Sequence, residues 1–223
     1  MNDDFIPGGY WTPENARAAV ARMTTQLAAP EMQAFMRDVA AGAAAGRDPA
    51  ALAAAMAATE PSAQRETAAI SAAACSYRRG RASDIPEFVR LIIAGELPPL
   101  FIDDFVEGFV VVEHEGTIVG CGGLEIYDRS GVIRSVVVDK RARGQHIGER
   151  MAELLMEEAR SAGLTDVYLF TMHAHNFWLR FGFIDQSLDA WNAPARACWQ
   201  YQFAAQYPAA MADVYPMWRR VDR

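Results

Sequence analysis

The sequence predicts an α/β fold: a mixed, mostly antiparallel sheet with helices on both faces, preceded by an Ala-rich helical segment. Two observations carry this prediction. Between residues 77 and 183, short β-branched and aromatic runs alternate with helical patterns. Residues 1–75, by contrast, contain 25 alanines, which favour helix but bury little apolar area. We therefore divide the chain into a helical segment, 1–75, and an α/β domain, 76–223, that ends in a helical extension.

The Ala-rich segment is predicted to form four short helices. A proline precedes each helix-forming run, a position that suits the first helical turn. The expected helices are 13–28, 30–45, 49–59 and 61–75. Because a bundle with so few large side chains has a small core, we expect it to dock on the main domain or on another subunit.

The α/β domain begins with a strand near Tyr77. A helix follows from Asp84, where a D-x-x-E capping pattern with Glu87 and a first-turn Pro86 mark its start. Two alternating runs around a Glu-Gly turn predict a β-hairpin. The later patterns predict, in order, hairpin strands at 109–114 and 117–127, a strand at 132–138, a helix at 147–162, a strand at 166–172 and a helix at 199–208.

Composition argues against several classes of protein. The chain has 223 residues, 52% of them hydrophobic, and a net charge of −7, whereas nucleic-acid-binding proteins are more often basic. No apolar run has membrane-spanning length, and the acidic N-terminus is unlike a signal peptide. Cys75, Cys121 and Cys198 are widely spaced and odd in number, so neither a disulfide framework nor a cysteine metal site is expected. We expect a cytoplasmic protein that binds neither nucleic acid nor membrane.

The stretch from Val136 to Arg150 is the most informative about function. A β-branched run ends at Asp139, a basic glycine-containing turn follows, and an amphipathic helix begins at Ile147. Unpaired N–H groups and the positive end of the helix dipole make such a helix start a binding site for phosphate. Between Ser135 and Arg150, four basic and two acidic side chains give a local charge of +2. The turn is therefore a candidate site for a small phosphorylated ligand.

This turn resembles the pyrophosphate loop of the GCN5-related N-acetyltransferases, the GNAT superfamily. That loop reads Q/R-x-x-G-x-G/A, and residues 143–148 read R-G-Q-H-I-G, with His146 where the family usually has glycine. Residues 177–183, F-W-L-R-F-G-F, are similar to the family's F-Y-x-x-x-G-F, with Trp178 at the tyrosine position. Segments such as G-C-G-G-L and I-R-S look like one branch, which holds the acetyltransferase domains of N-acetylglutamate synthases and the acetyltransferases of arsenic-resistance operons.

The resemblance implies acetyl-CoA as co-substrate, no metal, and N-acetylation of a small amine, with an amino acid or amino-acid-like compound favoured by the branch. It also implies that the strand before the turn binds the pantetheine arm and polarises the thioester carbonyl through a backbone N–H. The expected cofactor contacts are Val136, Val137, Val138, Arg143, Gly144, Gln145, His146, Ile147, Gly148, Glu149, Asn176 and Trp178. Two alternatives stay open: a protein amine, polyamine or aminoglycoside as acceptor, or an acyl-CoA-binding sensor without turnover.

Candidates for catalysis and acceptor binding flank the same strand. Glu125 is the first candidate for general base or amine-binding carboxylate; its alternative is a solvent-facing strand residue. Arg134 could hold an acceptor carboxylate or form a cross-strand ion pair with Glu125. Since indole cannot relay a proton, Trp178 is a donor to the sulfur or a packing residue. Either the CoA thiolate leaves without a dedicated acid, or another group serves as the acid. The full sets are Glu125, Asn176 and His175 for catalysis, and Arg134, Ser135, Tyr127 and His173 for the acceptor.

The motif His173-Ala174-His175 has a second interpretation, because H-x-H on a strand points both rings to one face. Without a nearby cysteine or a suitably spaced acidic ligand, a metal is not expected, and a proton shuttle is favoured. Cys121 lies in an apolar Gly-rich strand and is expected to be a buried small residue rather than an acyl-bearing nucleophile. The expected partner is a small-molecule amine, and a homodimer is left open.

Overall fold

The computed structural model describes residues 70–95, 97–206, 208–211 and 214–222. The four helices predicted for the Ala-rich segment lie outside the described residues, except for the end of the last one. There the chain forms a 3-10 turn, Ala72–Ala74, and enters strand β1 at Cys75. The predicted extension of a helix to residue 75 is therefore wrong, because Cys75 already pairs with His114 of the neighbouring strand.

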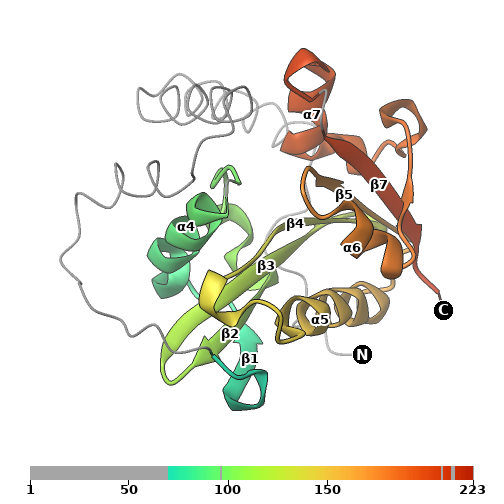
Figure 1. Cartoon of the computed structure of the whole chain (residues 1–223). Helices are drawn as coiled ribbons and strands as arrows, with labels where there is room; N and C mark the ends of the chain where they lie inside the picture. Colours follow the sequence, from blue (N-terminus) through green and yellow to red (C-terminus); the bar gives the residue numbers. More distant parts are fainter. Residues whose placement is uncertain (1–69, 96, 207, 212–213, 223) are drawn as a thin grey trace, which may run out of the picture.

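A seven-stranded sheet in the order β1-β2-β3-β4-β5-β7-β6 forms the centre of the fold (Figure 1). The strands are β1 Cys75–Arg79, β2 Phe109–His114, β3 Thr117–Tyr127, β4 Ser130–Val138, β5 Asp166–Thr171, β6 Ile184–Asp185 and β7 Tyr215–Arg220. The pair β4–β5 is parallel, and every other neighbouring pair is antiparallel. The mixed, mostly antiparallel sheet is confirmed, and the hairpin strands β2 and β3 have the predicted bounds.

Helices cover both faces of this sheet. They are α4 Ile85–Ala94, α5 Ile147–Ser161, α6 His175–Arg180 and α7 Trp199–Gln206. Because side chains alternate along a strand, Phe109 and Val111 of β2 pack with α4 on one face, whereas Val110 and Val112 pack with α5 on the other. No helix in the described part of the chain is both long and apolar enough to cross a membrane.

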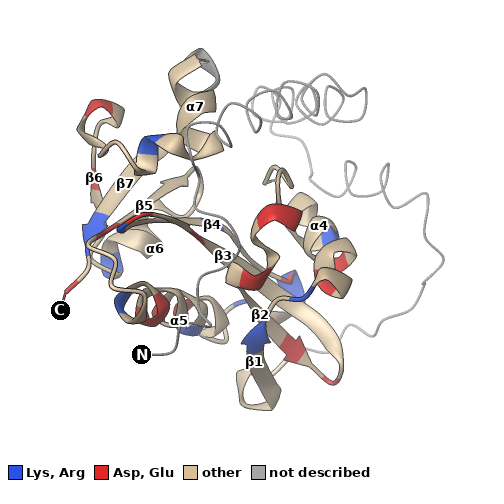
Figure 2. Cartoon of the chain, turned by 180° about the vertical axis from the view of Figure 1, so that it is seen from behind, with Lys and Arg blue, Asp and Glu red and all other residues tan. Residues whose placement is uncertain are grey.

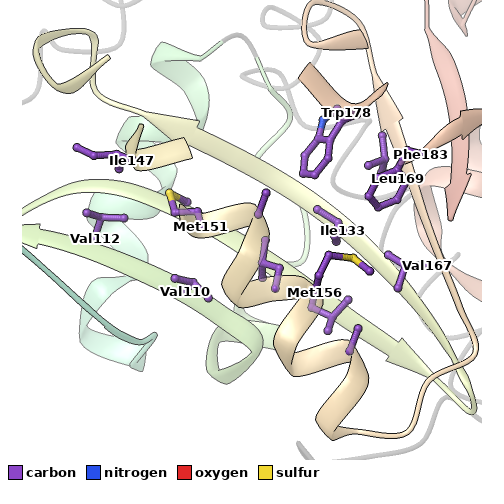
Figure 3. Close-up of a cluster of buried hydrophobic side chains, with 14 of the residues drawn as sticks. Val110, Val112, Ile133, Ile147, Met151, Met156, Val167, Leu169, Trp178 and Phe183 are labelled. Atoms are coloured by element: carbon purple, nitrogen blue, oxygen red, sulfur yellow. The ribbon is translucent and has the colours of Figure 1, made fainter. Parts of the chain in front are cut away.

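The amphipathic character predicted for α5 is confirmed. Its apolar stripe, which includes Met151 and Met156, packs on Ile133 and Val167 of the central strands (Figure 3). Both basic and acidic residues occur along α5 (Figure 2). Arg150 forms ion pairs with acidic residues one and two turns along the helix. Exposed ion pairs of this kind stabilise a helix only slightly, so the buried stripe holds α5 on the sheet.

The start of α4 differs from the prediction in its capping. Pro86 occupies the first turn as expected, but the side chain of Asp84 makes no capping hydrogen bond to α4. It accepts the backbone N–H of Arg81 at 2.9 Å and pairs with Arg78 at 2.7 Å. The hydrogen bond from Arg78 lowers the pKa of Asp84 below its usual value. A nearby guanidinium has thus replaced the helix N-terminus as the partner of this carboxylate.

Candidate functional site

Strands β4 and β5 separate part-way along their length. Their pairing runs from Ser130 opposite Asp166 to Ile133 opposite Leu169 and stops there, although β4 continues to Val138. Within the described sheet, residues 134–138 have a strand partner only on the β3 side. Their other edge can therefore hydrogen-bond an extended ligand in the way that a sheet edge accepts an added strand.

A β-bulge lies at the point of separation. Between β3 and β4 the register passes from Cys121 opposite Val137 to Gly123 opposite Arg134, so β4 contributes one extra residue. Ser135, in this interval, has a φ of +53°. Since a bulge bends and twists the strand that carries it, it accounts for the departure of β4 from β5.

The turn after β4 reaches α5 through two residues with positive φ, Gly144 at +74° and His146, the N-cap residue, at +60°. A Cβ added to Gly144 would meet nothing within 4 Å, and the nearest atoms to one added to Gly148 would belong to Phe177 and Val138, at 3.8 and 3.9 Å. The helix start is thus open in front of Gly148, with first-turn N–H groups that lack helical partners. This geometry fits a phosphate group.

Several basic side chains near this turn are engaged with neighbouring groups. Arg141 pairs with Asp139 at 2.9 Å, and Arg150 binds acidic residues of its own helix. Arg143 donates from Nε to the carbonyl oxygen of Val138 at 3.0 Å. The turn keeps its net positive charge. Binding of an anion there would, however, depend more on backbone N–H groups than the sequence had indicated.

Glu125 lies in the interior of the domain, so its solvent-facing alternative is wrong. It is 0% exposed, and both carboxylate oxygens are occupied. Arg134 donates to Oε1 at 2.7 Å, and the Tyr127 hydroxyl donates to Oε2 at 2.6 Å. Burial, reinforced by the negative charge of Glu125, raises the pKa of Tyr127 well above its usual value. The cross-strand ion pair is present, and its geometry suits positioning of Arg134 better than removal of an acceptor's proton. The role of general base stays a prediction.

Arg134 joins several parts of the structure. Besides Glu125 on β3, its guanidinium hydrogen-bonds the carbonyl oxygen of Leu100, and its Nε donates to Ser135 Oγ at 3.3 Å. Its Cζ lies 5.3 Å from the ring centre of Trp199 on α7. The indole Nε1 of Trp199 is itself buried without a hydrogen-bond partner. The cluster therefore links β3, the β4 bulge, the loop after α4, and α7.

Trp178 packs among aromatic side chains of α6 and the turn that follows it. It is only 5% exposed, and its ring centre lies 5.0 Å from that of Phe177 and 5.3 Å from that of Phe183. Figure 3 shows it near Leu169 and Ile133 in the core on the α5 side of the sheet. Trp178 therefore has the packing role that the sequence analysis considered. Contact with a cofactor stays a prediction for Trp178 and for Asn176, which is exposed.

The two histidines of the H-x-H motif do not lie on a strand, so the strand geometry considered for a metal site is absent. β5 ends at Thr171, whose hydroxyl accepts the N–H of Ala174 at 3.1 Å and turns the chain into α6. His175 begins that helix, with Nε2 2.7 Å from Asp185 Oδ1, whereas His173 is exposed. Among the described residues there is no cluster of three or more potential metal ligands.

The cysteines differ in accessibility, which gives a testable prediction. Cys121 and Cys198 are buried, and burial raises the pKa of both thiols far above the usual value. Because the thiolate is the reactive form, we expect a reagent such as DTNB to react with half-buried Cys75 in the native protein, and with Cys121 and Cys198 only after unfolding. Fast native labelling at Cys121, located by peptide mass spectrometry, would contradict this and favour a nucleophilic role.

Sequence reasoning missed three contributors to the site. Leu100 acts through its backbone carbonyl, which no residue pattern reveals. Trp199 lies in an aromatic-rich run that the sequence analysis identified as a helix. The contact of its ring with the Arg134 guanidinium was not predicted. Tyr215 stacks on His175 with ring centres 4.4 Å apart, and it belongs to β7, which the sequence did not predict.

Comparison with known proteins agrees with this geometry. Residues 77–183 match the Acetyltransferase (GNAT) family. An amino-acid acetyltransferase of Mycobacterium tuberculosis is 33% identical over 118 residues, which is 48% of this chain and 67% of that protein. One of Ralstonia nicotianae is 28% identical over 99 residues, 44% of this chain. The match spans only 22% of the length of the Ralstonia protein.

Solved structures share the fold. N-acetylglutamate synthase from Neisseria gonorrhoeae, complexed with coenzyme A and N-acetyl-glutamate, has a TM-score of 0.57 at 22% identity, covering 67% of this chain and 35% of that one. Rv2747 from Mycobacterium tuberculosis, in complex with CoA and NLQ, has a TM-score of 0.55 at 24% identity. The match covers 66% of this chain and 99% of that one. Together with the sequence matches, these findings show that the chain belongs to the GNAT family of acetyltransferases.

Proposed function

We propose that this protein transfers the acetyl group of acetyl-CoA to the amine of a small molecule, and that the acceptor is an amino acid or an amino-acid-like compound. The observation that carries the proposal is the separation of β4 from β5 directly before an open helix start at Gly148. Membership of the GNAT family, and the CoA complexes of its structural neighbours, support the choice of cofactor.

The residues at this point fit CoA. The free edge of residues 134–138 can hydrogen-bond an extended pantetheine arm, and the first N–H groups of α5 can bind a pyrophosphate. When bound, acetyl-CoA supplies an activated thioester carbonyl. We expect a backbone N–H near Val136 or Val137 to donate to its oxygen, which stabilises the negative charge that develops during attack.

The chemistry also requires a proton acceptor. The amine nitrogen attacks the carbonyl carbon, the C–S bond breaks, and the amine gives up one proton to a base or to water. Glu125 is poorly suited, since both oxygens are bound in the interior. His175 is better suited, because it begins α6 just after β5 and a carboxylate, Asp185, orients its ring at 2.7 Å. We therefore favour His175 as the base.

The preference for an amino acid follows from hydrogen-bond donors left over near Arg134. Three of the five guanidinium N–H groups are used by Glu125, Leu100 and Ser135. The buried indole N–H of Trp199, beside the same guanidinium, has no partner. Buried donors are normally satisfied, so this cluster favours an acceptor that carries a carboxylate.

Matched acceptor pairs test this preference. We would compare amine-dependent CoA release for each L-amino acid with release for its primary amide, which keeps the amine and the side chain but removes the negative charge. A charge-assisted hydrogen bond contributes about 1.5–3 kcal/mol, so kcat/KM should favour the acid by roughly tenfold or more. Equal rates within each pair would overturn the amino-acid proposal and favour a polyamine or another cationic acceptor.

Trp178 provides a separate prediction for the leaving group. If its indole N–H donates to the departing sulfur, Trp178→Phe should lower kcat about threefold to tenfold, the contribution of one hydrogen bond. Trp178→Tyr should retain activity, because a phenol donates and also titrates. Acetyl-CoA affinity and thermal stability, measured on the same variants, separate this effect from loss of packing. An unchanged kcat in Trp178→Phe would leave Trp178 with a packing role only.

A further inference from the structure

His146 occupies a backbone conformation that is unfavourable for a residue with a side chain. Its φ of +60° and ψ of 12° lie in the left-handed region, which side chains with a Cβ disfavour and glycine adopts freely. Its side chain is 85% exposed, so packing does not hold it there. Residues in this conformation cluster at ligand-binding and active sites.

A chain of charged groups orients the imidazole ring. Nδ1 of His146 lies 2.5 Å from Oε2 of Glu149, one turn into α5. The other oxygen of Glu149 lies 3.4 Å from Arg180 of α6, whose guanidinium lies over the ring of Phe177. With Nδ1 held by the carboxylate, Nε2 is the nitrogen left for another partner. A ring that donates from Nδ1 to Glu149 can also donate from Nε2 only when it is positively charged.

We propose that the His146 imidazole is an additional ligand of the CoA pyrophosphate in this protein, in place of the glycine usual in related loops. Its Nε2–H would donate to a phosphate oxygen beside the first N–H groups of α5, and Glu149 and Arg180 would fix the ring. The inference rests on the proposed binding of acetyl-CoA at this helix start. It assigns the pyrophosphate contact in part to a side chain, and it explains why a strained residue stands at this position.

The test combines two replacements with three ligands. His146→Gly removes the ring and relieves the strained φ, whereas His146→Ala removes the ring and keeps the strain. Binding of CoA, dephospho-CoA and pantetheine is measured by titration calorimetry on the full chain. We expect both variants to bind CoA and dephospho-CoA roughly threefold to tenfold more weakly than wild type, and pantetheine equally well. His114→Ala, on a strand that pairs only with β1 and β3, is the matched control.

One further readout distinguishes a ligand contact from a structural role. His146→Gly should melt at the same temperature as wild type or higher, although it binds CoA more weakly. Equal CoA affinity in wild type and His146→Gly would overturn the proposal, and an effect confined to CoA but absent with dephospho-CoA would overturn the assignment to the pyrophosphate. If wild type binds no CoA at all, the proposed function itself fails.

Discussion

Arg134→Met is expected to lower the free energy of unfolding by about 3–5 kcal/mol, the usual cost of leaving one charge of a buried ion pair without its partner. The side chains of Arg134 and Glu125 are 2% and 0% exposed. After the replacement, Tyr127 would be the one remaining side chain bound to the carboxylate in the described structure. Urea denaturation followed by tryptophan fluorescence measures the change, provided that the transition is two-state.

Two controls define what this result means. The double variant Glu125→Met/Arg134→Met removes both charges, so it should be more stable than Arg134→Met alone. Arg90→Met breaks the exposed pair with Glu87, whose partners are 47% and 42% exposed, and should cost less than about 1 kcal/mol. If Arg134→Met and Arg90→Met unfold at the same urea concentration, Arg134 and Glu125 do not form the buried pair.

Gly148→Val is expected to weaken acetyl-CoA binding by roughly tenfold to a hundredfold. A branched side chain at this position would stand between the first N–H groups of α5 and a phosphate, where each charge-assisted hydrogen bond lost costs about 1.5–3 kcal/mol. The fold itself should tolerate the change. A Cβ there would make only ordinary contacts with Phe177 and Val138, at 3.8 and 3.9 Å. Titration calorimetry with acetyl-CoA gives the affinity.

A melting curve without ligand serves as the control for Gly148→Val, and it should resemble that of wild type. Gly148→Ala, with a smaller side chain, should have an intermediate affinity. Wild-type affinity in both variants, with normal melting, would show that the phosphate does not bind at this helix start.

The parts of the fold that were predicted depend on local patterns. The hairpin of β2 and β3 could be placed because alternating apolar runs flank a Glu-Gly turn, and Glu115 and Gly116 both have positive φ. The helix α5 follows from its amphipathic period, and the predicted start at Ile147 is correct. The phosphate-binding turn could be proposed because a strand, a basic glycine-containing turn and a helix start follow one another directly in the chain.

The parts that could not be predicted depend on contacts between distant residues. β7 was missed because Pro216 interrupts its strand pattern; in the structure Pro216 lies opposite Phe170 of β5. The ion pair of Arg134 with Glu125 lies beside the bulge at Ser135, and serine carries no signal for a φ of +53°. The metal interpretation of the H-x-H motif assumed strand geometry, and nothing in its residues shows that Thr171 turns the chain first.

The central claim is that bound acetyl-CoA is turned over by an amine, and its direct test is CoA release from acetyl-CoA with the full chain. Release would be followed with and without a panel of amino acids, polyamines and aminoglycosides, and the acetylated product identified by mass spectrometry. We expect release above the rate of hydrolysis with at least one amino acid, and an N-acetylated product. Binding of acetyl-CoA without amine-dependent release for any member of the panel would contradict the proposed small-molecule acetyltransferase and favour a sensor of acyl-CoA.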